Sequence, residues 1–269
     1  MKIGVFDSGL GGLLITKALR AAMPDYDLVY LGDTLHVPYG RRSAETVFQL
    51  TKNAMDYLFR EQDCHLIILA CNTASASALR RLQQTYLAEH FPNRRILGVV
   101  IPTLEHAIDL GHTNIGLIAT ENMVDSGIYD DELRKINPAI NLRSVATPLL
   151  VPMIENNGMR YIEPILNDNL APFKTTKIQS LILGCTHYPR LAPLIKKILG
   201  EDVHLISQMD ILPPSLIDYL TRHPEHDAQL SKNATTQFFV TDLTPGYAES
   251  ACEAYEGNVE LRVASYEPL

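Results

Sequence analysis

The sequence predicts an α/β fold of two similar parallel-sheet domains, related by pseudo-two-fold symmetry, with a ligand site in the cleft between them. Short apolar runs that end in small polar residues are typical of buried parallel strands, and here they alternate with helical patterns. Segments also recur in order along the chain: Ile3–Phe6 resembles Ile115–Ile118 at an offset of 112, and Cys71 recurs as Cys185 at an offset of 114. A repeat this long indicates duplicated domains rather than a solenoid.

The apolar runs and the helical periodicity give the expected elements in order. Strands are expected at 2–7, 28–32, 66–70, 96–101, 115–119, 142–146, 178–183 and 238–241. Helices are expected at 9–22, 43–62, 73–88, 103–110, 126–136, 161–170 and 192–199. Ser43 is a suitable N-cap for the second helix. Because ligands bind at the carboxyl edge of open parallel sheets, the polar residues that follow each strand are the candidates for a site.

The repeat also suggests where the domains divide. We expect a first domain of residues 1–97 plus 207–269 and a second domain of residues 98–206, with the tail from Val203 returning to the first unit. A chain of 269 residues, 46% of them hydrophobic, is long enough to give both domains a core.

Composition excludes several classes of protein. The net charge is −8 and no dense block of Lys and Arg is present, which argues against a nucleic-acid partner. No apolar run approaches the roughly 18 residues that cross a bilayer. The N-terminus enters a strand directly, without the layout of a signal peptide, so we expect a cytoplasmic protein.

Two cysteines in matched settings are the strongest functional signal. Cys71 and Cys185 each close an apolar run and are followed by Asn72-Thr73 and Thr186-His187. At a helix N-terminus the dipole favours the thiolate, and an ordinary cysteine pKa of about 8.5 needs only modest help near neutral pH. A single cysteine at a strand end is often structural, but a matched pair predicts two equivalent acid/base groups facing one substrate. Asn72, Thr73 and Thr186 are neutral donors for a carboxylate, and His187 could exchange a proton.

Three further segments are candidates, each with a simpler structural alternative. Asp7-Ser8 precede Gly9-Leu10-Gly11-Gly12, where Leu14 breaks a dinucleotide-binding pattern, so a helix N-terminus facing a carboxylate is favoured over a nicotinamide site; a plain capping turn is the alternative.

The loop at 32–40 contains Asp33, Tyr39 and Gly40, of which Tyr39 could wall off a pocket or simply be packed. Glu155, in a loop after an apolar run, could be a second acid near His187 or a solvated glutamate. The histidines lack metal-ligand spacing, and no catalytic metal is expected.

Five motifs together resemble the glutamate racemases of the aspartate/glutamate racemase superfamily. They lie in order between residues 6 and 189 and are Phe6-Asp7-Ser8-Gly9-x-Gly11-Gly12, Gly32-Asp33-Thr34, Pro38-Tyr39-Gly40, Cys71-Asn72-Thr73-Ala74-Ser75-Ala76 and Gly184-Cys185-Thr186-His187-Tyr188-Pro189.

The resemblance implies racemisation of glutamate by two bases and without a cofactor, supplying D-glutamate for the bacterial cell wall. It implies that Cys71 serves the D-isomer with help from Asp7, and that Cys185 serves the L-isomer with help from His187 and Glu155. The amino acid would be held by Asp7, Ser8, Tyr39, Gly40, Asn72, Thr73, Thr186 and His187. It also suggests a homodimer.

The sequence departs from the family pattern at three places: Leu35-His36, Met123, and Gln208-Met209. These bear on substrate affinity, on control by effectors and on domain contacts, and they leave the two thiols intact. A sister racemase for aspartate or a hydantoin, a non-catalytic amino-acid-binding protein, and a redox dithiol with a Cys71–Cys185 disulfide remain alternatives.

Overall fold

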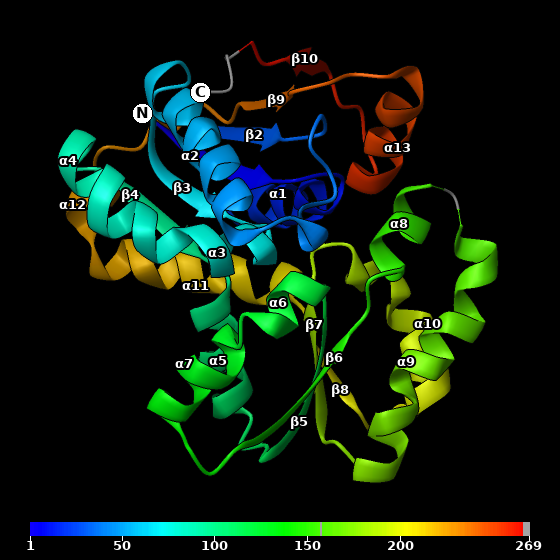
Figure 1. The fold of residues 1–269 in the computed structure, drawn as a ribbon. Helices are drawn as coiled ribbons and strands as arrows, with labels where there is room; N and C mark the ends of the chain where they lie inside the picture. The colour runs from blue at the N-terminus through cyan, green and yellow to red at the C-terminus, as the bar shows by residue number, and fades with distance from the viewer. Residues whose placement is uncertain (157, 266–269) are drawn as a thin grey trace.

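The computed structural model describes residues 1–156 and 158–265, which form two parallel sheets (Figure 1). The large sheet has the order β10-β9-β2-β1-β3-β4 and the small sheet the order β6-β5-β7-β8. The strands of the large sheet are β1 (Lys2–Asp7), β2 (Leu28–Gly32), β3 (Cys64–Leu69), β4 (Arg95–Gly98), β9 (Thr236–Val240) and β10 (Leu261–Val263). Those of the small sheet are β5 (Asn114–Ala119), β6 (Asn141–Ala146), β7 (Ser180–Gly184) and β8 (His204–Ile206).

The duplication inferred from the sequence is visible in the strand order. The run β2-β1-β3-β4 matches β6-β5-β7-β8, and every pairing is parallel. The registers also correspond, because β1 ends at Asp7 opposite Gly32 and β5 ends at Ala119 opposite Ala146. The α/β class with two parallel sheets is therefore confirmed.

Helices cover both faces of each sheet, as parallel strands buried on both sides require. The large sheet lies between α2 (Ala44–Arg60) with α3 (Asn72–Arg81) and α1 (Gly11–Ala22) with α11 (Gln208–Arg222). The small sheet lies between α8 (Leu150–Glu155) with α9 (Ile162–Thr176) and α10 (Ala192–Leu199), and α5 (Val100–Asp109) with α7 (Ile128–Ile136). The other helices are α4 (Ala88–His90), α6 (Glu121–Asp125), α12 (Pro224–Asp227) and α13 (Pro245–Tyr255), with a π-helix at Leu82–Leu87 and 3₁₀ turns at Tyr39–Arg41, Met159–Tyr161 and Tyr188–Leu191.

Helix α11 joins the two halves of the molecule. Its Leu212, Leu216 and Leu220 belong to the core of the large sheet, whereas Ile211 belongs to the core of the small sheet. In Figure 1 this helix runs beneath the large sheet, above the small one. The residues at its start are therefore close to both units.

Several expected boundaries differ from the structure. The tail does not return to the first unit at Val203, because His204–Ile206 first forms β8 beside β7. Strands β8 and β10 were not predicted, since each has only three residues and lacks a distinct apolar run. The strand expected at 96–101 ends at Gly98, because the apolar Val-Val-Ile run begins α5 with Pro102 in its first turn, where proline is tolerated. The domain boundaries at 97 and 206 stay a prediction.

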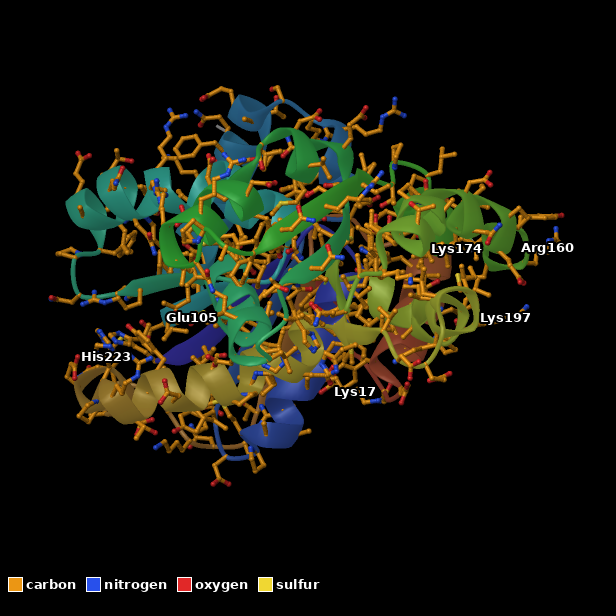
Figure 2. All side chains as sticks on the ribbon, turned by 90° about the horizontal axis from the view of Figure 1, so that it is seen from below. Lys17, Glu105, Arg160, Lys174, Lys197 and His223 are labelled. Carbon is orange, nitrogen blue, oxygen red and sulfur yellow. The ribbon has the colours of Figure 1, made fainter. Side chains whose placement is uncertain are left out.

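Charged side chains lie on the surface of the molecule. Arg160, Lys174 and Lys197 are exposed and point outward around α9 and α10 (Figure 2). Among residues 1–156 and 158–265, no helix combines the length and apolarity needed to cross a membrane.

Candidate active site

A small cavity lies where the carboxyl edges of the two sheets face each other. Its volume is about 30 Å³, about the volume that one water molecule takes in the liquid. The cavity is lined by Ser8, Pro38, Tyr39, Gly40, Arg41, Cys71, Asn72, Thr73, Thr120, Glu121, Thr147, Pro148, Val151, Pro152, Gly184, Cys185, Thr186 and His187. Both matched cysteines therefore border the same cavity.

The internal repeat places these residues in corresponding positions. Phe6 pairs with Leu69 in the large sheet, and its counterpart Ile118 pairs with Leu183 in the small one. Cys71 and Cys185 each lie two residues after the paired leucine, so they occupy equivalent places after β3 and β7. By the same correspondence, Ser8 matches Thr120. The site is thus built from two copies of one strand-end arrangement.

Cys71 stands at the N-cap of α3 and is 6% exposed. Its Sγ lies 3.7 Å from the Ser8 Oγ. Burial and the nearby Asp7 raise the pKa of the Cys71 thiol to about 12, although the backbone N–H of Ala74 acts in the opposite direction. The N-terminus of α3 thus favours the thiolate, as expected, but burial and Asp7 outweigh this effect and the net direction of the Cys71 pKa is upward.

Cys185 is the first member of a chain of polar contacts. Its Sγ lies 3.5 Å from Nδ1 of His187, and Nε2 of His187 lies 2.7 Å from Oε1 of Glu155. Burial alone would lower the pKa of His187, but Cys185 and Glu155 hold it well above its ordinary value. The sequence analysis placed Glu155 in a loop, but in the structure it is the last residue of α8. The imidazole is thus positioned to bear a proton beside the thiol.

Asp7 connects the two units from behind the cavity. It is completely buried, accepts a hydrogen bond from the Gly9 N–H at 2.9 Å, and accepts another from the Thr186 hydroxyl at 3.1 Å. Burial raises the pKa of Asp7 to about 6, against the lowering effect of His187. Gly11 permits this approach, because a Cβ there would stand 2.2 Å from Thr186 Oγ1.

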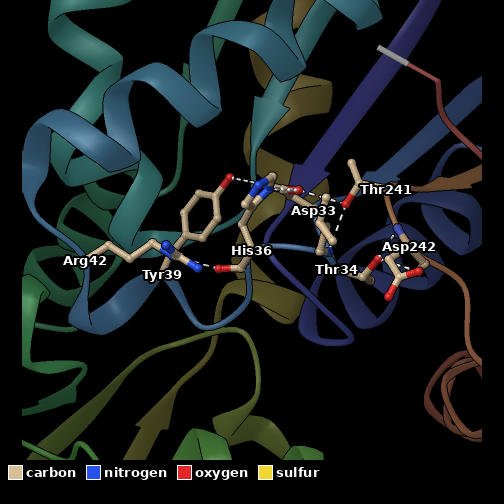
Figure 3. A network of polar contacts seen from close by, with 8 residues as sticks. Asp33, Thr34, His36, Tyr39, Arg42, Thr241 and Asp242 are labelled. Atoms are coloured by element: carbon tan, nitrogen blue, oxygen red, sulfur yellow. Dashed lines mark hydrogen bonds and ion pairs between the residues drawn. The ribbon is translucent and has the colours of Figure 1, made fainter. Parts of the chain in front are cut away.

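The loop after β2 is held by Asp33 (Figure 3). Its carboxylate accepts hydrogen bonds from the hydroxyls of Tyr39 at 2.5 Å and Thr241 at 2.8 Å, and Nδ1 of His36 lies 2.9 Å away. His36, one of the departures from the family pattern, thus contacts Asp33, whereas Leu35 is 57% exposed. This network fixes Tyr39 and Gly40 against the cavity.

The structure brings together most of the residues selected from the sequence. Nine line the cavity: Ser8, Tyr39, Gly40, Cys71, Asn72, Thr73, Cys185, Thr186 and His187. Asp7 and Glu155 do not line it and reach it through Thr186 and His187.

Sequence reasoning missed two threonines, Thr120 and Thr147, which line the cavity at the ends of β5 and β6. The Thr120 and Thr73 hydroxyls are 3.1 Å apart. The internal repeat is the signal that identifies Thr120, as the counterpart of Ser8. Met123, one of the departures from the family pattern, is instead buried in the core of the small sheet.

Within residues 1–156 and 158–265 no three His, Cys, Asp or Glu side chains are grouped so that they could hold a metal ion. The four cysteines are free thiols.

Comparison with known proteins agrees with this geometry. The model of the Asp/Glu/hydantoin racemase family matches residues 14–212. The chain is 35% identical to the glutamate racemase of Dinoroseobacter shibae over the full length of both proteins. It is 38% identical to that of Bacillus cereus, with 77% of this chain and 76% of the relative covered.

Solved structures give the same result for the fold. A glutamate racemase from Francisella tularensis, crystallised with D-glutamate, has a TM-score of 0.88 at 32% identity and covers 98% of this chain and 97% of its own. The racemase from Aquifex pyrophilus has a TM-score of 0.81 at 33% identity, with 98% of each chain covered. The chain therefore belongs to the glutamate racemases of the Asp/Glu/hydantoin racemase family.

Proposed function

We propose that this protein interconverts L- and D-glutamate by a two-thiol mechanism without a cofactor. The observation that carries the proposal is the placement of Cys71 and Cys185 at equivalent positions around one cavity. Racemisation needs proton removal on one face of the α-carbon and proton return on the other, and two equivalent groups on opposite units suit this requirement. The product D-glutamate would supply cell-wall synthesis.

The proposed step conserves protons. One cysteine, as thiolate, takes the α-proton of glutamate, and the electron pair of the broken C–H bond is delocalised into the α-carboxylate. The opposite thiol then gives its proton to the other face of the carbon. The two sulfurs have exchanged protonation states at the end of each turnover, so the reverse reaction uses them in the opposite order. We assign Cys71 to the D-isomer and Cys185 to the L-isomer.

Each thiol has its own supporting groups in this proposal. His187, held by Glu155 at 2.7 Å and 3.5 Å from Cys185, stabilises a thiolate there as an imidazolium. On the other side, Asp7, whose pKa is raised to about 6, takes or returns the proton of Cys71. A pKa near neutrality suits a group that must both accept and donate a proton.

Neutral donors hold the substrate and lower the barrier. Ser8, Asn72, Thr73 and Thr186 offer hydroxyl, amide and backbone hydrogens to the glutamate carboxylates, while Tyr39 and Gly40 wall the cavity. An amino-acid α-proton is only weakly acidic, so preorganised donors in a site closed to water must stabilise the charge that develops on the carboxylate.

The test is α-proton exchange followed by NMR in deuterated buffer, with L- and D-glutamate offered separately and no cofactor added. We expect exchange with inversion from either isomer. Cys71→Ala and Cys185→Ala should each lower the rate of inversion by about 10³-fold or more, because each removes an essential acid or base. Cys252→Ala is the matched control, because Cys252 is partly exposed and does not line the cavity.

Other results would redirect the assignment. Exchange with aspartate or another small acid, but none with glutamate, would make the protein a sister racemase. Binding of glutamate without any exchange, by folded protein with reduced thiols, would support a non-catalytic amino-acid-binding protein.

Two further expectations belong to this proposal: a homodimer, and action in the cytoplasm, where free glutamate is available as substrate. Light scattering after size-exclusion chromatography tests the first, with a dimer mass expected. Fractionation of cells that produce the protein tests the second, since racemase activity should stay with the cytoplasmic fraction.

A further inference from the structure

A cluster of buried polar residues lies behind Asn72, outside the set already assigned to the site. It consists of Tyr129 on α7, Thr103 on α5 and Gln208 at the start of α11. Gln208 and Thr103 are completely buried, and Tyr129 is 1% exposed. The cluster brings together three helices that meet where the two units join, and it ends at a residue that lines the cavity.

Both hydrogen bonds to Asn72 from this cluster reach the same atom. The Tyr129 hydroxyl donates to Asn72 Oδ1 at 3.0 Å, and Gln208 Nε2 lies 3.4 Å from the same oxygen. Asn72 Nδ2 is buried and has no hydrogen-bond partner within the described part of the chain. The cluster therefore occupies the acceptor side of the amide, whereas the donor side has no partner, on a residue that lines the cavity.

An unpaired buried amide donor costs free energy, and its presence beside a cavity needs an explanation. A carboxylate in the cavity would accept from it, and hydrogen bonds to charged groups are stronger than those between neutral ones. The opposite orientation of the amide would turn its oxygen toward the carboxylate, where two acceptors would repel each other. The orientation of the Asn72 amide thus decides whether the residue attracts or opposes an anionic substrate.

We propose that Gln208 and Tyr129 are positioning residues that hold the oxygen of Asn72 and turn its N–H₂ toward a carboxylate of the substrate. The proposal rests on the glutamate racemase function proposed above and extends it. It also gives a role to Gln208, which stands where this sequence departs from the family pattern. Gln208 is especially suited to this task, because Nε2 is also 3.5 Å from both Thr103 Oγ1 and the Tyr129 hydroxyl, which fixes the donor end of its own amide.

The first variant removes the donor while keeping the shape. Gln208→Met has a similar volume and also removes Gln208 Oε1, which is itself unpaired within the described residues. We expect KM for both glutamate isomers to rise about tenfold, the scale of one weakened charge-assisted hydrogen bond, with kcat changed less than threefold. The same substitution at an exposed position, Gln229→Met, is the control and should leave both constants unchanged.

The second variant gives a signature that a merely structural role would not produce. In Gln208→Glu, an ionised carboxylate can only accept, so it turns the Asn72 amide around and points its oxygen at the substrate. At lower pH the protonated acid can donate, and the original orientation returns. We therefore expect the ratio of variant to wild-type KM to increase with pH. Tyr129, the titratable group in direct contact, stays protonated throughout, because burial raises its pKa.

The outcomes distinguish failure of the proposed racemase function from failure of the positioning role of Gln208. If the wild-type protein does not racemise glutamate, the proposed function fails, whatever Gln208 does. If the wild type is active but Gln208→Met matches Gln229→Met in KM, with no pH-dependent KM ratio in Gln208→Glu, the positioning role is overturned. Loss of kcat at unchanged KM, in variants with wild-type melting temperature, would also overturn it.

Discussion

At the residue scale, Asp7 combines a functional position with a cost in stability. Its carboxyl group is completely buried, and burial raises its pKa to about 6, above the ordinary value near 4. The folded protein therefore keeps this proton at pH values where the unfolded chain has released it. It follows that the free energy of unfolding falls as the pH rises from about 4 to above 6, by roughly 3 kcal/mol at most.

Asp7→Asn should remove this penalty, and with it the group that we propose exchanges a proton with Cys71. We expect the variant to gain up to roughly 3 kcal/mol relative to wild type between pH 4 and pH 8, because asparagine does not ionise, and to lose activity. Urea unfolding at both pH values measures the gain, with Asp109→Asn at an exposed position as control. An equal stability difference at the two pH values would show that Asp7 does not titrate in this range.

At the scale of elements, the contact between the start of α1 and Thr186 depends on a glycine. A Cβ at Gly11 would lie 2.2 Å from Thr186 Oγ1 and 2.8 Å from its backbone carbon, so the neighbouring unit must move. Gly11→Ala should lower kcat by at least about tenfold, since displacements of about 1 Å in a site are costly. Gly246→Ala, where a Cβ meets nothing within 4 Å, is the control. Wild-type kcat in Gly11→Ala would mean that the two units need not approach this closely.

Individual elements also differ in how well the sequence predicts them. Strands with long apolar runs were found, and so were the side chains at their ends, because local pattern and the edge of a parallel sheet together place Asp7, Cys71 and Cys185. Short strands such as β8 have too few residues to show an apolar run that would predict them. The contacts of Tyr129 and Gln208 with Asn72 could not be predicted for another reason, because they form only through the packing of helices distant in sequence. The pKa of Cys71 depended on burial, which the sequence does not report.

At the scale of the whole molecule, the cavity must open before a substrate can enter. Its volume of about 30 Å³ is several times smaller than glutamate. Helix α6 of the second unit closes one side by contacts with the first unit. Ser77 Oγ donates to Asn122 Oδ1 at 3.1 Å, and Asn122 Nδ2 donates to the Arg42 carbonyl at 3.0 Å. Asn122 thus links two segments of the first unit to α6 from outside the cavity.

Asn122→Ala should favour the open form. Loss of two hydrogen bonds worth about 1 kcal/mol each is expected to speed amide exchange in the segment 119–127 by up to about thirtyfold, measured by hydrogen–deuterium exchange mass spectrometry. Added D-glutamate should slow exchange of this segment in both proteins, because a bound substrate favours the closed form. Asn141→Ala removes a hydrogen bond to Asn114 within the small sheet and serves as the control. Exchange that is faster in Asn141→Ala than in Asn122→Ala would locate the motion within the second unit instead of between the two.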